Sequence, residues 1–154
     1  MAKPRLGAQV PDFTVATTGG PFRLRAARGG SLVLYFYPRD NTSGCTREAE
    51  AFRDLHPRFR RAGAVILGVS PDSLDSHQRF RAKLSLPFEL ASDPEHELAT
   101  CFGAWTQKTL YGRRFMGIER STFWIDARGV LQAEWRKVRV AGHAEAVLAA
   151  VTAA

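Results

Sequence analysis

Cysteine is scarce in this chain of 154 residues, which contains only Cys45 and Cys101. Two cysteines cannot form the disulfide framework of a small secreted domain, and neither has a partner at zinc-finger spacing. The four histidines show no ligand spacing, and no phosphate-binding loop or dinucleotide fingerprint is present. We therefore expect a protein with no metal centre and no bound cofactor.

Long apolar runs are also missing. No stretch approaches the roughly 18 apolar residues that a membrane-spanning helix needs. Residues 1–5 are followed by Leu-Gly-Ala-Gln at 6–9, and not by the apolar core of a signal peptide. We expect no membrane association, no secretory signal, and a cytoplasmic, reducing location, where structural disulfides are rare. The length fits a single domain spanning residues 1–154.

Acidic residues are outnumbered, because 22 Lys and Arg face 15 Asp and Glu and give a net charge of +7. Eighteen of these cations are arginines, and they are spread along the whole chain. A nucleic-acid-binding surface favours a basic stripe interleaved with aromatic side chains, which is not seen here. Nucleic-acid binding is thus a disfavoured alternative, which a salt-dependent gel shift would test.

Hydrophobic periodicity predicts an α/β domain. Continuous apolar, β-branched and aromatic runs at 31–37 and 64–70 are typical of strands buried on both faces of a central sheet. Further strands are predicted at 13–16, 22–24, 88–91, 121–126 and 130–135, with hairpin turns at 17–21 and 127–129. Helices are predicted from Cys45 to Gly63, from Ser73 or Asp75 to Leu84, from Asp93 and Pro94 to Phe102, and from His143 to Val151. This order predicts a mixed sheet with helices on both faces.

Cys45 follows a predicted strand and a short polar loop, and it stands at the start of a predicted helix. Unpaired N–H groups and the positive end of the helix dipole lie at such a position, and both stabilise a thiolate. A lone cysteine can also simply pack in a core. The pattern Pro-x-x-x-Thr-x-x-Cys, formed by Pro38, Thr42 and Cys45, favours catalysis. Pro38 can shield the sulfur, Thr42 offers a hydroxyl one helical turn away, and Gly44 allows close backbone approach.

The segment 35–49 resembles the peroxidatic segment of peroxiredoxins, and it is most similar to the bacterioferritin-comigratory, or peroxiredoxin Q, subfamily. The resemblance extends over almost the whole chain and includes segments 68–73, 92–94, 102–105, 116–123 and 135–145. It implies a thioredoxin-like fold with a mixed central β-sheet flanked by helices and an N-terminal β-hairpin extension.

The resemblance also implies a reaction, the reduction of hydrogen peroxide and organic hydroperoxides. The Cys45 thiolate would attack a peroxide oxygen and become a sulfenic acid, while Thr42 and the Cys45 N–H hold the oxygens. The active-site arginine of the family matches Arg120, whose guanidinium stays charged and offers fixed donors for developing negative charge. Taken alone, Arg120 would be one surface arginine among 18.

The chain departs from this subfamily in its second thiol. The two positions where relatives carry a resolving cysteine are Glu50 and Arg81 here. Cys101 matches neither position, and free cysteines often only pack. We therefore expect a one-cysteine cycle in which an external thiol reduces Cys45, and overoxidation of Cys45 by excess peroxide. The alternative is an atypical cycle with a bridge between Cys45 and Cys101.

A further alternative is a thioredoxin-like thiol–disulfide oxidoreductase. Residues 42–45 have the length of a Cys-x-x-Cys motif, but Thr42 replaces the first cysteine, so dithiol exchange cannot close. The expected partners are therefore peroxides and thioredoxin or a similar thiol reductant. We expect a monomer or a weak homodimer.

Overall fold

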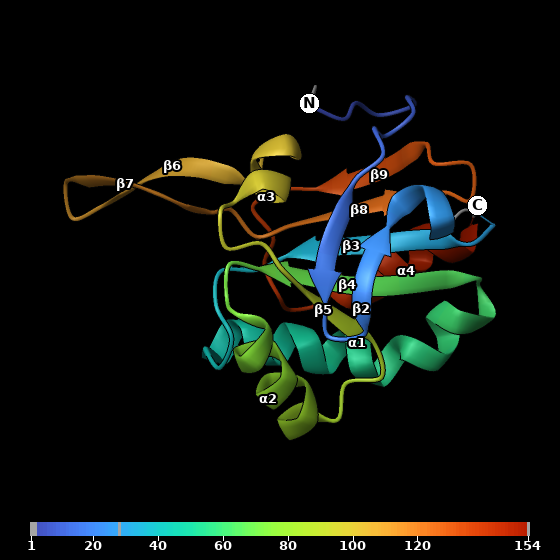
Figure 1. Cartoon of the computed structure of the whole chain (residues 1–154), viewed down its shortest axis with the longest axis horizontal. Helices are drawn as coiled ribbons and strands as arrows, with labels where there is room; N and C mark the ends of the chain where they lie inside the picture. Colours follow the sequence, from blue (N-terminus) through green and yellow to red (C-terminus); the bar gives the residue numbers. More distant parts are fainter. Residues whose placement is uncertain (1–2, 28, 154) are drawn as a thin grey trace.

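The two continuous apolar runs form neighbouring strands at the centre of a seven-stranded sheet (Figure 1). The computed structural model describes residues 3–27 and 29–153, so positions 1–2, 28 and 154, including both ends of the predicted domain, lie outside the described residues. The strands are β1 (Thr14–Thr17), β2 (Gly20–Arg23), β3 (Ser31–Phe36), β4 (Ala64–Ser70), β5 (Glu89–Ser92), β8 (Ser121–Ile125) and β9 (Leu131–Trp135).

The order of strands across this sheet is β2-β1-β5-β4-β3-β8-β9. Strands β3, β4 and β5 run parallel, whereas β1, β2, β8 and β9 join by antiparallel pairing. The predicted mixed sheet is therefore confirmed, and the N-terminal hairpin β1–β2 extends one of its edges through β5.

The helices are α1 (Ser43–Arg61), α2 (Leu74–Leu84), α3 (Glu97–Cys101) and α4 (His143–Ala153), with a short 3₁₀ turn at Leu24–Ala27. Side chains alternate across β3, so Val33 and Tyr35 pack with α1, α2 and α4 on one face. Leu34 and Phe36 pack on the other face with α3 and the N-terminal segment. Helices cover both faces as predicted, although three of the four lie on one side.

The helix predicted from Asp93 and Pro94 begins later, at Glu97. Pro94 lies in a turn before it, so the prediction that proline occupies the first helical turn is wrong. The cause is His96, whose left-handed backbone (φ +59°) separates the turn from the helix. The buried Asp93 carboxylate still caps the helix, because it accepts hydrogen bonds from the N–H groups of Leu98 and Ala99 at 3.1 and 2.9 Å.

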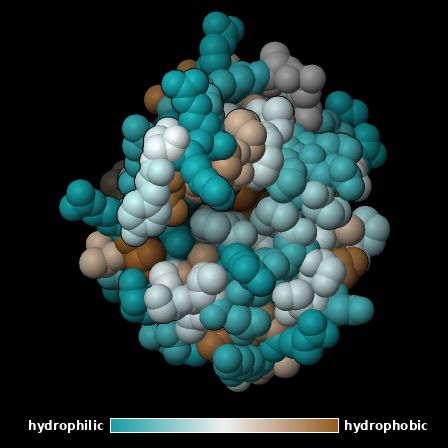
Figure 2. Space-filling view, turned by 90° about the vertical axis from the view of Figure 1, so that its left-hand side faces the viewer, coloured by the Kyte–Doolittle hydropathy of each residue, from teal (hydrophilic) through white to brown (hydrophobic). Residues whose placement is uncertain are grey.

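A second, two-stranded sheet was not predicted. Strands β6 (Trp105–Leu110) and β7 (Arg113–Ile118) pair with each other and project from the molecule as an arm, at the left of Figure 1. Tyr111 and Gly112 form its two-residue turn, both with positive φ. Figure 2 faces this end of the molecule and shows apolar atoms among hydrophilic ones on its surface. Four apolar side chains of the arm are exposed: Leu110, Tyr111, Phe115 and Met116.

Among the described residues, no helix is both long enough and apolar enough to cross a bilayer.

Candidate active site

Cys45 is the third residue of α1, which begins where the loop from β3 ends. Thr42 has an extended backbone (φ −83°, ψ 153°) and is the N-cap residue, and its carbonyl accepts the N–H of Thr46 at 2.9 Å. The Cys45 sulfur thus lies in the first turn, as the sequence predicts, near N–H groups that have no partner within the helix. The residue is only 2% exposed.

Arg120 reaches Cys45 from the short connection between the arm and β8. Its Nη2 atom lies 3.4 Å from the Cys45 sulfur. Gly44 makes room for this approach, because a Cβ atom there would stand 3.3 Å from the same nitrogen. The antiparallel pairing of β8 with β3 brings residue 120 beside the start of α1, although 75 residues separate Arg120 from Cys45.

Glu48 is the second partner of Arg120, and the sequence did not predict a role for it. One of its oxygens accepts a hydrogen bond from Arg120 Nη1 at 2.6 Å, and the side chain is 1% exposed. Burial raises the pKa of this carboxyl to about 7, against the opposing effect of Arg120. Burial also acts against the charge on Arg120, but Glu48 and Cys45 outweigh it and raise the arginine pKa.

A signal for Glu48 was present in the sequence. Cys45, Ala49 and Phe52 follow helical spacing on the buried face of α1, and Glu48 falls on that same face. A carboxylate on a buried face needs a cation partner, since a charge is costly to bury alone. Pattern alone does not say which of the 18 arginines supplies that partner.

Thr42 and Pro38 lie in the loop that leads into α1 and Cys45, but both are exposed. The Thr42 hydroxyl donates to the backbone carbonyl of Arg39 at 2.9 Å, and not to the sulfur. The described structure therefore brings Cys45 and Arg120 into contact and places Thr42 and Pro38 at the rim. Arg39 and Arg47, which flank the motif, are exposed as well.

The floor of the site is aromatic. The Tyr35 ring stacks on Phe52 with centroids 4.7 Å apart, and burial, followed by the nearby Glu48 and Cys45, raises the pKa of its hydroxyl. His143 binds Thr122 Oγ1 through Nε2 at 2.7 Å. Burial, with a smaller effect of Arg120, lowers the pKa of His143 to about 4, so the imidazole is neutral at pH 7. Because His143 is uncharged, the positive charge in contact with the Cys45 sulfur is that of Arg120.

Cys101 lies elsewhere. It ends α3 and belongs to the core on the opposite face of the sheet from Cys45. Burial raises the pKa of its thiol.

The chain is similar to known proteins over nearly its whole length. A family model described as the AhpC/TSA family matches residues 6–134, which include Cys45 and Arg120. Peroxiredoxin Bcp of Bacillus subtilis is 49% identical over 139 residues, covering 90% of this chain and 88% of that protein. Peroxiredoxin Bcp of Xanthomonas campestris is 48% identical over 149 residues, covering 96% and 93%.

Solved structures show the same similarity. Peroxiredoxin Q of Xanthomonas campestris matches with a TM-score of 0.88 at 48% identity, covering 92% of this chain and 90% of that one. A mutant of peroxiredoxin Q from Xylella fastidiosa matches with a TM-score of 0.92 at 37% identity, covering 99% and 98%.

Proposed function

Because this chain belongs to the AhpC/TSA family and is a peroxiredoxin of the Bcp and peroxiredoxin Q type, we propose that Cys45 is the thiol with which it reduces peroxides. The observation that carries this assignment is the 3.4 Å contact between the Cys45 sulfur and the Arg120 guanidinium at a helix N-terminus. A fixed cation and unpaired N–H groups favour the thiolate, which is the nucleophilic form.

In the first step, the thiolate forms a bond to one peroxide oxygen as the O–O bond breaks. Sulfur loses two electrons and becomes the sulfenic acid. The departing oxygen takes the electron pair of the O–O bond and a proton from solvent, which replaces the one the thiol released on ionising, and leaves as water or an alcohol. Arg120 stabilises the negative charge that develops on that oxygen. The Cys45 N–H and Thr42, once its hydroxyl turns from the Arg39 carbonyl, bind the two peroxide oxygens.

Hydrogen peroxide and organic hydroperoxides are the proposed substrates. A solved structure of the Xanthomonas campestris bacterioferritin comigratory protein is named for its alkyl peroxide reduction activity. The rim at Pro38 and Thr42 is exposed, which leaves room for the organic group of a hydroperoxide outside the buried sulfur.

We propose a one-cysteine cycle, which is supported by the placement of Cys45 and Cys101 in separate hydrophobic cores. An external thiol would attack the sulfenic sulfur and release water, and a second thiol would free Cys45 and leave as part of a disulfide. Glu50 and Arg81 occupy the resolving positions, and Arg81 binds the Phe88 carbonyl at 3.0 Å. Cys101 packs on the other face of the sheet, so an intrachain bridge to Cys45 would require the sheet to be disrupted.

Thioredoxin or a similar thiol is the proposed reductant, acting on a monomer or weak homodimer. A reducing, cytoplasmic setting suits a chain whose two thiols are both free. Scattered positive charge, without a basic and aromatic stripe, supports no role in nucleic-acid binding.

A stopped-flow peroxidase assay with thioredoxin as reductant tests the proposal. Cys45→Ser should abolish peroxide consumption, because it removes the nucleophile, whereas the matched Cys101→Ser variant should retain it. Turnover by Cys45→Ser would refute the assignment of the nucleophile.

Peptide mass spectrometry tests the cycle. The wild-type protein is treated with peroxide and kept free of reductant. A Cys45–Cys101 linkage in good yield would replace the one-cysteine cycle with the atypical two-cysteine cycle.

A further inference from the structure

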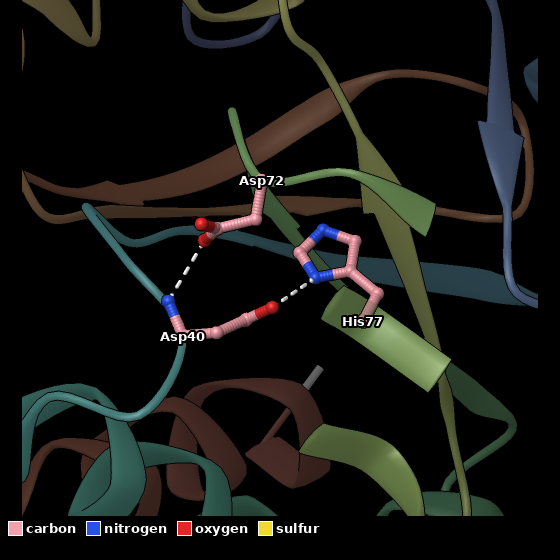
Figure 3. A group of neighbouring side chains, drawn as sticks. All are labelled: Asp40, Asp72 and His77. Carbon is pink, nitrogen blue, oxygen red and sulfur yellow. Dashed lines mark hydrogen bonds and ion pairs between the residues drawn. The ribbon is translucent and has the colours of Figure 1, made fainter. Parts of the chain in front are cut away.

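A polar cluster of two buried residues and one half-buried residue lies beside the active site and takes no part in the reaction described above. It consists of Asp40 from the loop between β3 and α1, Asp72 from the loop after β4, and His77 from α2 (Figure 3). One candidate ligand atom from each lies within 4.8 Å of the others. These atoms already have hydrogen-bond partners, so the geometry is that of a hydrogen-bonded network and not of a prepared metal site.

Asp40 is the centre of this network, and its side chain is 1% exposed. One carboxylate oxygen accepts the Tyr37 hydroxyl at 2.6 Å. The other accepts the Ser76 hydroxyl at 2.8 Å and faces His77 Nδ1 at 2.7 Å. The Asp40 backbone N–H donates to Asp72 at 2.8 Å. The residue is therefore bound through both its side chain and its backbone.

His77 is held through both of its ring nitrogens. Its Nε2 lies 2.9 Å from the backbone carbonyl of Ala91, which can only accept, so Nε2 carries a hydrogen. Burial alone would raise the pKa of Asp40, but hydrogen bonds from His77 and Tyr37 outweigh it and lower that pKa. His77 Nδ1 and the Asp40 carboxylate, 2.7 Å apart, therefore form a fully buried hydrogen-bonded pair.

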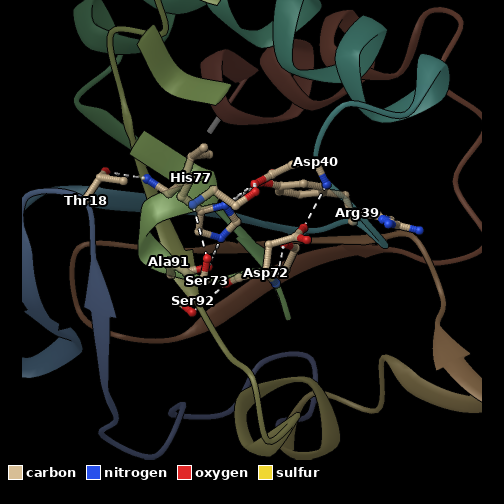
Figure 4. A network of polar contacts seen from close by, with 12 residues as sticks. Thr18, Arg39, Asp40, Asp72, Ser73, His77, Ala91 and Ser92 are labelled. Atoms are coloured by element: carbon tan, nitrogen blue, oxygen red, sulfur yellow. Dashed lines mark hydrogen bonds and ion pairs between the residues drawn. The ribbon is translucent and has the colours of Figure 1, made fainter. Parts of the chain in front are cut away.

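Asp72, which accepts the Asp40 N–H, is itself held in place by hydrogen bonds (Figure 4). Asp72 accepts the Ser70 hydroxyl at 2.7 Å, and its carbonyl accepts the Ser92 hydroxyl at 2.6 Å. The network thus ties the β3–α1 loop to the ends of two central strands and to α2. Asp40 stands three residues before Ser43, where α1 and its catalytic turn begin.

Reduction of Cys45 requires this loop to move. The residue is 2% exposed, so the thiol of another molecule cannot reach the sulfur while the loop and the first turn of α1 stay in place. Asp40 belongs to the loop that leads into the Cys45 turn of α1, whereas Asp72 and His77 belong to the separate segment formed by the end of β4 and α2. The hydrogen bond between Asp40 and His77 is therefore a large share of what opening has to break, since a buried polar group left without its partner is costly.

We propose that His77, acting through Asp40, is a positioning residue that holds the β3–α1 loop in its peroxide-reactive form and sets how readily the loop opens to an external thiol. This inference rests on the proposed function of Cys45. It makes the two halves of the catalytic cycle compete, because a tighter loop favours attack on peroxide and a looser loop favours reduction of the sulfenic acid.

The test measures the two half-reactions separately in His77→Gln by stopped flow. Reduced protein is mixed with hydrogen peroxide, and pre-formed sulfenic acid is mixed with dithiothreitol. We expect reduction to speed up by about tenfold, because a buried hydrogen bond to a charged group is worth roughly that factor or more. Oxidation should slow by a smaller factor, because one opening equilibrium does not change the closed and the open populations equally. Ser76→Ala, which removes one neutral donor to Asp40, should change both rates in the same directions by less.

Gln78→Ala is the matched control. Gln78 neighbours His77 on α2, but its amide binds the Thr18 carbonyl at 2.9 Å and does not touch the loop. Both of its rates should equal those of wild type. General destabilisation by His77→Gln would lower both rates together, so a parallel fall, or no change in either, would overturn the role of His77.

Two further outcomes separate this inference from the function on which it rests. A wild-type protein that forms no sulfenic acid with peroxide contradicts the proposed function. Normal wild-type half-reactions, with no opposing shift in the variants, contradict only the role of His77. If His77→Gln does not fold, Ser76→Ala decides the question by the same opposing shift.

Discussion

The two cysteines lie on opposite faces of the same sheet, and both are buried: Cys45 is 2% exposed and Cys101 is 7% exposed. Burial raises the pKa of the Cys101 thiol and so disfavours its reactive form. Cys45 differs in having a guanidinium 3.4 Å from its sulfur and a helix N-terminus around it. Two thiols with similar burial thus differ in the charges and dipoles around them, and the proposed role of Cys45 as nucleophile rests on that difference.

The largest expected effect is on stability, for a substitution in the core on the sheet face where Cys101 packs. Phe102 is fully buried there and its ring centroid lies 4.8 Å from that of Phe123. Phe102→Ala should lower the free energy of unfolding in urea by about 3–5 kcal/mol, because it leaves a cavity. The peroxide rate constant of the folded fraction should not change. In the matched variant Phe52→Ala, on the face of Cys45, that rate constant should also fall, since Phe52 packs on Tyr35 beneath the site.

Removal of the cation at Cys45 comes next. Arg120→Met should lower the rate constant for oxidation of Cys45 by about a hundredfold, the loss typical of a donor to developing negative charge. The exposed Arg47→Met is the control and should leave this rate near that of wild type. Equal losses in the two variants would mean that the general positive field, and not contact with Arg120, activates the thiol.

Glu48→Gln should have a smaller effect, about tenfold on the same rate, because Arg120 loses a charged hydrogen bond of that worth. Its pH dependence has a defined sign. The pKa of Glu48 is raised from 4.5 to about 7 by burial, so the folded protein holds a proton that the unfolded chain releases between these values. The titration of Glu48 therefore lowers the stability of the wild-type protein as the pH rises from 4.5 to about 7. Above about pH 7 it causes no further change in stability.

Urea unfolding of wild type and Glu48→Gln at pH 5 and pH 8 measures that contribution. The stability of wild type relative to the variant should fall between the two pH values, since glutamine does not titrate. A relative stability that rises with pH would contradict a raised pKa for Glu48 in the folded protein.

The smallest change is expected at Cys101 itself. After treatment with a modest excess of peroxide, peptide mass spectrometry should find two added oxygens on Cys45, the sulfinic acid, because no resolving thiol traps the sulfenate. The Cys101 peptide should be unmodified. Oxidation of both thiols to the same extent would remove the distinction between the two faces.

The sequence predicted the central strands because β3 and β4 are buried on both faces, which leaves a continuous apolar run that few other structures produce. It also predicted Cys45 at the start of a helix, from the loop that precedes it. The arm was missed because its apolar residues are exposed and its turn is Tyr111–Gly112, which lacks the Asn-Gly or Asp-Gly signal of a tight hairpin.

The partners in the site were harder to predict. Arg120 could be placed only through family resemblance, because its contact with Cys45 spans 75 residues and depends on which strands pair. His77 shares the buried face of α2 with Phe80 and Leu84, a position that signals a buried polar group. Its partner Asp40, 37 residues away, becomes visible only once the loop and helix are folded together.

The arm has a practical consequence for protein engineering. Its strands pair only with each other in the described structure, and Tyr111 at the turn is 96% exposed. Exposed turns of this kind accept inserted sequence with little loss of stability. The arm also ends at Ile118, two residues from Arg120. A reporter domain inserted at Tyr111–Gly112 would therefore lie outside the core, on the hairpin that leads directly to the arginine in contact with the Cys45 sulfur. If Cys45 is the peroxide-reactive thiol, this hairpin is the natural insertion point for a genetically encoded peroxide sensor.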